Sequence, residues 1–163
     1  VLATTGTVKS QAYIRTIEQM DGGSEVAQQA CPLFVPIVES GKHDSEEAEA
    51  AACKYVDPLL ADGCRTIILG CTHYPFLRKA ITSAAGPGVT IVDPAEETAK
   101  TLAEVLRSRN IASTALDEDH AFYTSGPAGD FAALGSEFLG KKINQVCEVT
   151  WGVDLGIAQK SAV

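Results

Sequence analysis

Short apolar runs alternate along the chain with stretches whose apolar residues recur at helical spacing. The runs predict six strands, at Val1–Thr4, Leu33–Val38, Thr66–Leu69, Val89–Val92, Phe122–Thr124 and Ile143–Val149. Helical spacing predicts helices over Val8–Met20, after Ser45, after Pro75, over Ala95–Leu106 and over Ala128–Leu139. This alternation favours an α/β fold with a mostly parallel sheet and flanking helices.

Prolines and capping residues refine these elements. Pro36 interrupts the run Leu33–Val38, which indicates a strand with an irregular end. Ser45 is a typical N-cap, and the carboxylates after it suit the positive end of a helix dipole. Pro58 predicts a kink or a restart in that helix. The segment Ser108–Asp119 is polar and acidic and predicts a connection without regular structure.

Length and charge exclude several classes of function. The 163 residues carry a formal charge of −8, which disfavours a nucleic-acid partner. A membrane span needs about 20 apolar residues, and the run at Thr66–Gly70 ends at Cys71, so no membrane segment is expected. The chain starts at Val1 without an initiator Met or a signal-peptide pattern, so it looks truncated or processed.

The cysteine pattern indicates free thiols in a reducing cytoplasm. The five cysteines have irregular spacing and form no Cys-x-x-Cys pair; they are Cys31, Cys53, Cys64, Cys71 and Cys147. A metal site is not expected, because Cys64, Cys71 and His73 lack the paired spacing of structural zinc ligands.

Polar residues follow three of the predicted strands. Ligands of an open parallel sheet bind beyond the carboxyl ends of its strands. Those ends carry Thr4–Thr7, Glu39–Gly41 and Gly70–His73. Cys71 is the most reactive side chain among them, because a helix N-terminus and nearby His73 would favour its thiolate. Spacing alone leaves a second interpretation open, in which Cys71 is a small buried residue.

A longer motif around Cys71 resembles a known family. Gly70-Cys71-Thr72-His73-Tyr74-Pro75-Phe76-Leu77 resembles the signature around the second catalytic cysteine of glutamate racemases. Related racemases of aspartate and hydantoins usually lack the His-Tyr-Pro part. Further matching segments follow the family's order, at Thr4–Tyr13, Cys31–Glu39, Val92–Ala95 and Phe122–Gly126, so that the resemblance covers essentially the whole chain.

The resemblance implies a two-base racemisation without a cofactor. Cys71 resembles the cysteine that faces L-glutamate, His73 the residue that assists its proton transfers, and Glu39 the carboxylate near that histidine. An imidazole close to a thiol can take and return its proton near neutral pH. Thr72, Thr4 and Thr7, together with His73, resemble the groups that bind substrate carboxylates. For Thr7, a helix cap before Val8 is the structural alternative, and Tyr13 is assigned a structural role.

The chain departs from the family in one important respect. The Asp-Ser pair, the Tyr-Gly element and the Cys-Asn-Thr turn with the first catalytic cysteine are absent from it, and its other four cysteines lie in different contexts. Family members fold as two similar α/β domains. The resemblance therefore predicts one central domain over residues 1–92, with the second catalytic cysteine, and the C-terminal part of an incomplete domain over residues 93–163.

These observations favour a fragment of a glutamate racemase that supplies D-glutamate for peptidoglycan. Its partner would be a small-molecule substrate, and the resemblance is compatible with a homodimer. Two alternatives stay open at this point: a racemase of aspartate or a related acid, and a noncatalytic binding module derived from a racemase.

Overall fold

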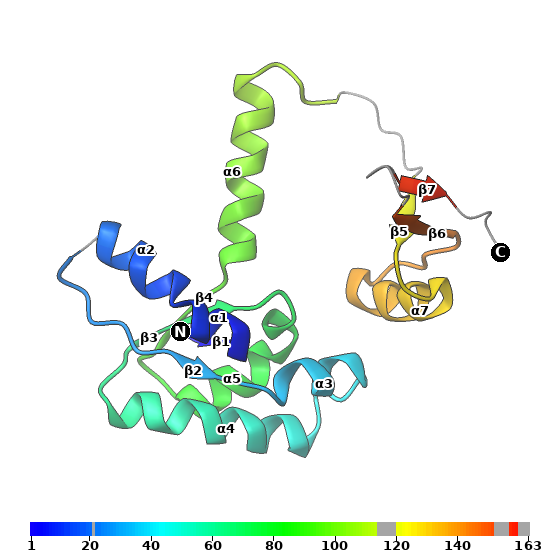
Figure 1. Cartoon of the computed structure of the whole chain (residues 1–163). Coiled ribbons are helices and arrows are strands. Elements are labelled where there is room, and N and C mark those ends of the chain that lie inside the picture. The colour runs from blue at the N-terminus through cyan, green and yellow to red at the C-terminus, as the bar shows by residue number, and fades with distance from the viewer. Residues whose placement is uncertain (21, 114–119, 152–156, 160–163) are drawn as a thin grey trace. The chain divides into compact units, whose positions relative to one another are not determined.

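The computed structural model describes residues 1–20, 22–113, 120–151 and 157–159. The chain divides into two compact units, an N-terminal unit of Val1–Ala112 and a C-terminal unit of Ser113–Val163. Each unit is an arrangement of strands and helices of its own (Figure 1).

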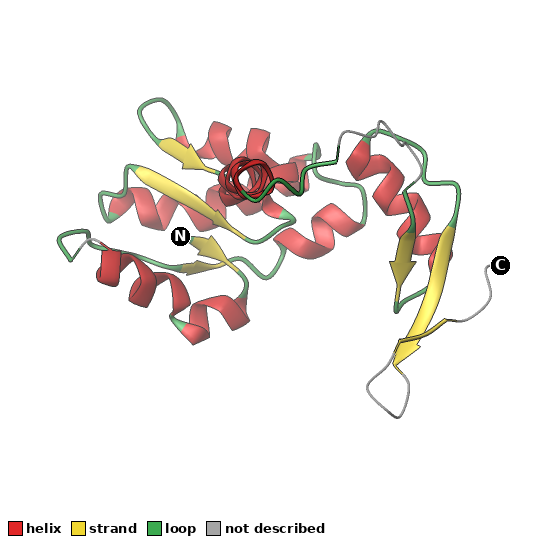
Figure 2. Ribbon diagram, turned by 90° about the horizontal axis from the view of Figure 1, so that it is seen from above, coloured by secondary structure: helices red, strands yellow, loops and turns green. Residues whose placement is uncertain are grey.

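The N-terminal unit is built on a parallel sheet with the strand order β2-β1-β3-β4 (Figure 2). The strands are β1 (Leu2–Ala3), β2 (Gln29–Ala30), β3 (Thr66–Gly70) and β4 (Thr90–Val92). The helices are α1 (Thr5–Ser10), α2 (Ala12–Met20), α3 (Phe34–Glu39), α4 (Glu46–Ala61), the 3-10 helix η1 (Tyr74–Leu77), α5 (Arg78–Ala85) and α6 (Pro94–Ser108). Helices α4 and α5 pack together beneath the sheet (Figure 1). The predicted α/β class is confirmed.

The segment Val8–Met20, predicted as one helix, forms two. Gln11 has a positive φ of 53° and ends α1, with its backbone N–H donating to the Val8 carbonyl at 3.1 Å. A left-handed residue cannot continue a right-handed helix. The chain therefore turns at Gln11, and α2 starts in a new direction at Ala12.

The prediction of a strand at Leu33–Val38 is wrong, because most of this segment belongs to helix α3 (Phe34–Glu39). Pro36 lies in the first turn of α3, where its missing N–H costs no helical hydrogen bond. Phe34, Ile37 and Val38 are buried and share one helical face. The strand of this region is the short β2, just before it, so Glu39 ends a helix and does not follow a strand.

Helix α4 begins where Ser45 predicts. The Ser45 hydroxyl accepts a hydrogen bond from the Ala48 N–H at 3.3 Å. The helix then continues through Pro58 to Ala61 without restarting. Pro58 lies near the C-terminal end on the exposed side. The Lys54 carbonyl that loses its partner there can be solvated, so the helix survives.

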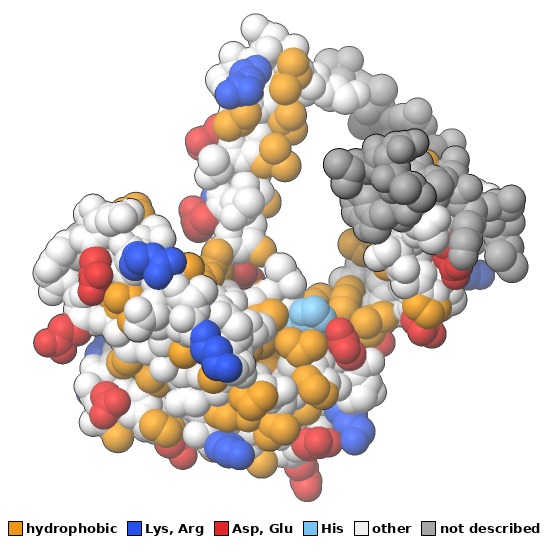
Figure 3. Space-filling model, in the orientation of Figure 1, with side chains coloured by type: hydrophobic (Ala, Val, Ile, Leu, Met, Phe, Trp, Pro, Cys, Tyr) orange, Lys and Arg blue, Asp and Glu red, His pale blue; other side chains and the backbone are white. Residues whose placement is uncertain are grey.

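The predicted elements around β3 and β4 are confirmed with small changes. The helix expected after Pro75 starts as η1 and becomes α-helical at Arg78. Helix α6 begins at Pro94, with the Asp93 carboxylate accepting from the Ala95 N–H at 3.0 Å. Its later turns expose apolar side chains, visible along one side of the helix in Figure 3; Leu102 is 56% exposed. Among the described residues, no helix has the length and hydropathy needed to cross a membrane.

The C-terminal unit contains a small mixed sheet. Strand β5 (Phe122–Thr124) pairs in parallel with β6 (Val146–Trp151), and β6 pairs antiparallel with β7 (Ile157–Gln159). The intervening helix is α7 (Ala128–Leu139). Strand β6 starts later than predicted because the Ile143 N–H donates to the Ser136 hydroxyl of α7 at 2.9 Å. Strand β7 was not predicted.

The division between the units lies after Ala112. Helix α6 contacts β3 and belongs to the N-terminal unit. The predicted boundary between residues 92 and 93 referred to the domains of a complete protein and stays a prediction. Residues 114–119 of the predicted acidic connection lie outside the described residues.

Candidate functional site

Cys71 lies in the turn between β3 and η1. The turn is closed by the Tyr74 N–H, which donates to the Cys71 carbonyl at 3.1 Å. The Cys71 thiol is partly exposed, and its Sγ lies 3.9 Å from Nδ1 of His73. This distance allows a proton to pass between the thiol and the imidazole with a small adjustment. Cys71 therefore has the surroundings of a reactive cysteine.

His73 also contacts Glu39, as the resemblance implied. The His73 Nε2 lies 3.3 Å from Oε1 of Glu39, which is the last residue of α3. A carboxylate at Nε2 favours the tautomer with its proton on that nitrogen. Nδ1 is then the acceptor that faces the thiol. Cys71, His73 and Glu39 thus form one chain of groups that can hold and move a proton.

Thr4 and Thr7 lie at the same edge of the sheet as Cys71. Strands β1 and β3 are parallel neighbours with Ala3 opposite Gly70, so Thr4 follows β1 where Cys71 follows β3. The hydroxyls of Thr4 and Thr7 are 2.9 Å apart, and the Thr7 N–H donates to the Thr4 hydroxyl at 3.2 Å. Thr4, and not Thr7, is therefore the cap of α1. The alternative prediction, that Thr7 caps the helix before Val8, is wrong.

A hollow of about 530 Å³ opens beside Cys71 and Thr72. Its far wall is the N-terminal part of α6, from Pro94 to Leu102, and Tyr13 of α2 lines it as well. Burial raises the pKa of Tyr13, and the nearby Cys71 raises it further. The sequence did not predict that Tyr13 and the start of α6 line this hollow. The matching segments at Thr4–Tyr13 and Val92–Ala95 contained the signal, but their proximity to Cys71 depends on the fold.

Cys31 also follows a strand at this edge but has a different environment. Its side chain is 1% exposed, and burial raises the pKa of the Cys31 thiol from 9.0 to about 12. Its Sγ donates to the Gln29 carbonyl at 3.4 Å. Cys31 is therefore a neutral, structural thiol near neutral pH.

The stability of the chain should depend on pH through Cys31. A raised pKa means that the folded state holds the proton more tightly, so this contribution is complete below pH 9 and is lost as pH rises toward 12. Between pH 8 and pH 10, the unfolding free energy should fall by about 1 kcal/mol more in the parent than in Cys31→Ala. Urea unfolding at pH 8 and pH 10 measures this difference, and Cys53→Ala, a change at an exposed cysteine, is the control. An equal fall of the unfolding free energy in the parent and in Cys31→Ala would contradict the prediction.

Gly70 leaves no room for a side chain. A methyl group there would lie 2.8 Å from the Leu2 carbonyl oxygen, 3.1 Å from the Tyr13 ring and 3.2 Å from the Ala3 methyl. We expect Gly70→Ala to destabilise the chain by about 3 kcal/mol in urea unfolding, because two of these neighbours belong to the sheet. Gly6→Ala is the matched control, since nothing lies within 4 Å of a methyl group there. Equal stability of Gly70→Ala and Gly6→Ala would contradict the prediction, because it would show that the neighbours of Gly70 move apart at no cost.

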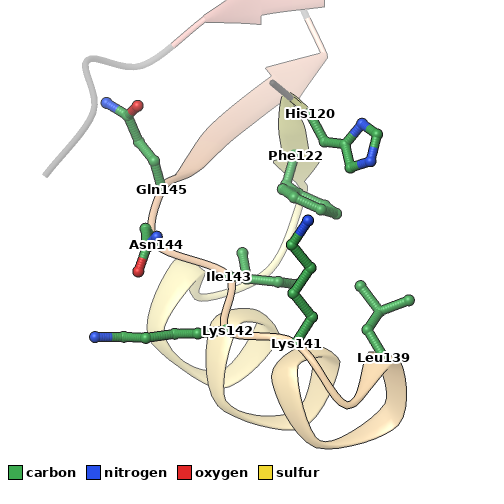
Figure 4. Close-up of a pocket in the computed structure, with 8 residues that line it drawn as sticks. All are labelled: His120, Phe122, Leu139, Lys141, Lys142, Ile143, Asn144 and Gln145. Carbon is green, nitrogen blue, oxygen red and sulfur yellow. The ribbon is translucent and has the colours of Figure 1, made fainter. Parts of the chain in front are cut away.

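The C-terminal unit has a hollow of about 350 Å³ at its surface (Figure 4). The Lys141 side chain extends toward Phe122, whereas Lys142 points to the opposite side of the loop. These groups do not converge on one point as catalytic groups would. Within the described ranges, no cluster of three His, Cys, Asp or Glu side chains could hold a metal ion.

Sequence comparison relates the chain to racemases. Residues 1–102 match the family described as Asp/Glu/Hydantoin racemase. A glutamate racemase of Geobacter metallireducens is 41% identical over 152 residues, which cover 92% of this chain and 56% of that protein. One from Neisseria meningitidis is 40% identical over 153 residues. The chain therefore spans a little more than half the length of these relatives.

Solved structures agree with this relationship. Glutamate racemase isoform RacE1 from Bacillus anthracis superposes with a TM-score of 0.81 at 33% identity, over 89% of this chain and 54% of that one. The glutamate racemase from Francisella tularensis, solved in complex with D-glutamate, gives 0.83 at 28% identity, over 91% and 56%. The fold of the chain is thus that of part of a racemase.

Proposed function

Because the chain belongs to the aspartate, glutamate and hydantoin racemase family, we propose that it is part of a glutamate racemase and supplies one of its two proton-transfer groups. The observation that carries this proposal is the chain of contacts from Cys71 through His73 to Glu39. Similarity to glutamate racemases over 92% of the chain supports glutamate as the substrate. The activity is proposed for the complete protein, of which this chain would be a part.

The proposed chemistry is a proton exchange at Cα without a cofactor. The Cys71 thiolate takes the α proton of L-glutamate, and the electron pair stays on the substrate as a carbanion next to its carboxylate. A second acid, from the part of the protein beyond this chain, gives a proton to the opposite face and yields D-glutamate. The thiolate is available because His73 first takes the thiol proton of Cys71 through Nδ1, and Glu39 stabilises the imidazolium that results. After inversion the imidazolium gives its proton to the solvent and the second acid takes one up, which restores the starting state.

The hydroxyls at the sheet edge are proposed to bind the substrate. Thr4 follows β1 at the sheet edge where Cys71 follows β3, and Thr7 is hydrogen-bonded to Thr4. Thr72 lines the hollow beside Cys71. Hydroxyl and backbone N–H groups at strand ends are suited to carboxylates. The Thr4 and Thr7 hydroxyls share one hydrogen bond, in which one of them donates, so the hydrogen of the other is available for an anion. Held there by a carboxylate, the substrate Cα would face Cys71.

The biological setting is part of the same proposal. D-glutamate made in this way would serve peptidoglycan synthesis in the cytoplasm, where free thiols such as Cys71 stay reduced. Self-association into a homodimer is likewise proposed, and sedimentation of the complete protein would test it.

The decisive test is a racemase assay of the complete protein that contains this segment. We expect circular dichroism to show conversion of both L- and D-glutamate, with much slower conversion of aspartate. Faster conversion of aspartate than of glutamate would show that the complete protein is an aspartate racemase. Turnover of neither acid by a folded complete protein would favour a noncatalytic binding module.

A further inference from the structure

Glu39 and His73 come from segments that are far apart in the sequence, and an exposed ion pair alone holds two side chains together only weakly. Glu39 is 54% exposed in its contact with His73. We propose that the buried aromatic contact between Phe34 and Tyr74 is the positioning device that sets the Glu39–His73 distance and keeps Nδ1 of His73 at Cys71. Its catalytic consequence rests on the proposed function, but the positioning itself does not.

The two rings lie at the right places in the chain for this role. Phe34 begins α3 and Glu39 ends it, so that both belong to one short helix of six residues. Tyr74 directly follows His73 and begins η1. A shift of either ring therefore moves one member of the Glu39–His73 pair.

The rings make a close and fully buried contact. Their centroids are 5.0 Å apart and their planes meet at 89°, which is the favourable edge-to-face arrangement. Both side chains are 0% exposed. A third ring, Tyr55 of α4, meets Phe34 at 5.2 Å and 84°, so Phe34 is held from a second side. Such a cluster has few alternative packings.

One carbonyl group joins the two segments to the sheet. The Cys31 carbonyl accepts the Phe34 N–H at 3.2 Å and the Tyr74 hydroxyl at 3.3 Å. The Cys31 N–H in turn donates to the Ala3 carbonyl of β1 at 2.9 Å. The start of α3 and the start of η1 are thus fixed to the same point at the end of β2. This carbonyl anchors both segments to the sheet, and the aromatic pair sets where Glu39 meets His73.

Coupling between His73 and Cys71 can be measured without substrate, on the 163-residue chain itself. Iodoacetamide reacts with the thiolate, so the Cys71 rate reports whether His73 can take its proton. Peptide mass spectrometry separates Cys71 from exposed Cys53, which serves as the reference, and from buried Cys31, whose labelling would reveal unfolding. We expect His73→Asn to slow Cys71 alkylation about tenfold in the parent chain.

The test is a double-mutant cycle with the aromatic pair. In chains carrying Phe34→Leu or Tyr74→Leu, His73→Asn should change the Cys71 rate by less than about twofold, because His73 is already displaced. Tyr74→Phe keeps the ring contact and should retain most of the tenfold effect. Ile81→Ala, a buried change on α5, controls for general loss of stability and should also retain it.

The outcomes separate positioning from stability. A full tenfold effect of His73→Asn in the Phe34→Leu and Tyr74→Leu chains would overturn the proposal, as would no effect of His73→Asn in the parent. If one leucine variant fails to fold, as Cys31 labelling would show, the other decides. Racemisation is not measured here, so failure of the glutamate assay leaves this result unaffected.

Discussion

Cys71→Ser in the complete protein should lower kcat for glutamate racemisation by at least about 10³-fold in both directions. Serine fits the space of cysteine, but its hydroxyl remains protonated near pH 7 and cannot serve as the base. The Cys71 Sγ is the atom that faces Nδ1 of His73 at 3.9 Å. With a serine hydroxyl in its place, the imidazole has no thiol proton to take or return. The loss should appear in kcat, because substrate binding is assigned to other groups.

Two variants make this result specific. His73→Asn should lower kcat by about 10²-fold, since it removes an assisting group and leaves the thiol in place. Cys53→Ser is the matched control, because Cys53 is exposed on α4 and lies outside the site; it should keep full activity. Circular dichroism of D- and L-glutamate measures all three. Full activity of Cys71→Ser would refute the assignment of Cys71 as a base.

The elements that sequence predicts well are those with strong local signals. Thr66–Leu69 is a run of β-branched and aliphatic residues and forms β3, and Ser45 caps α4 through its own neighbour Ala48. The run Leu33–Val38 carries both a strand and a helix signal. The choice is made by Tyr55 and Tyr74, which pack against Phe34 from distant positions. Strand β2, with two residues, is too short to show a period.

The site divides in the same way. Cys71 and His73 are two residues apart, so their proximity follows from local sequence. The contact of His73 with Glu39 spans the sheet edge and was implied only by the family resemblance. The wall formed by Tyr13 and α6 was missed, because it depends on the left-handed turn at Gln11 and on the path of the chain after β4. Tertiary packing, and not residue type, places these groups.

The 163-residue chain by itself should not racemise glutamate measurably. Inversion at Cα needs a base on one face and an acid on the other. Cys71 is the cysteine placed beside a histidine at the sheet edge. Cys31 is buried and its raised pKa keeps it neutral, and Cys64 lies before β3, at the opposite end of that strand. Cys53 is exposed on α4, and Cys147 lies in β6 of the other unit.

D-glutamate incubated with the chain should therefore keep its circular dichroism signal, whereas the complete protein should abolish it. Proton NMR of L-glutamate in D2O gives a sharper comparison, because Cys71 is assigned to the α proton of that enantiomer. A single base that removed this proton and returned a deuteron to the same face would exchange it without inversion. Cys71→Ser in the same chain is the control. Inversion by the parent chain that is lost in Cys71→Ser would show that a second acid lies within these residues. Inversion that survives in Cys71→Ser would contradict the role of Cys71 altogether, because the proton would then be removed by another group.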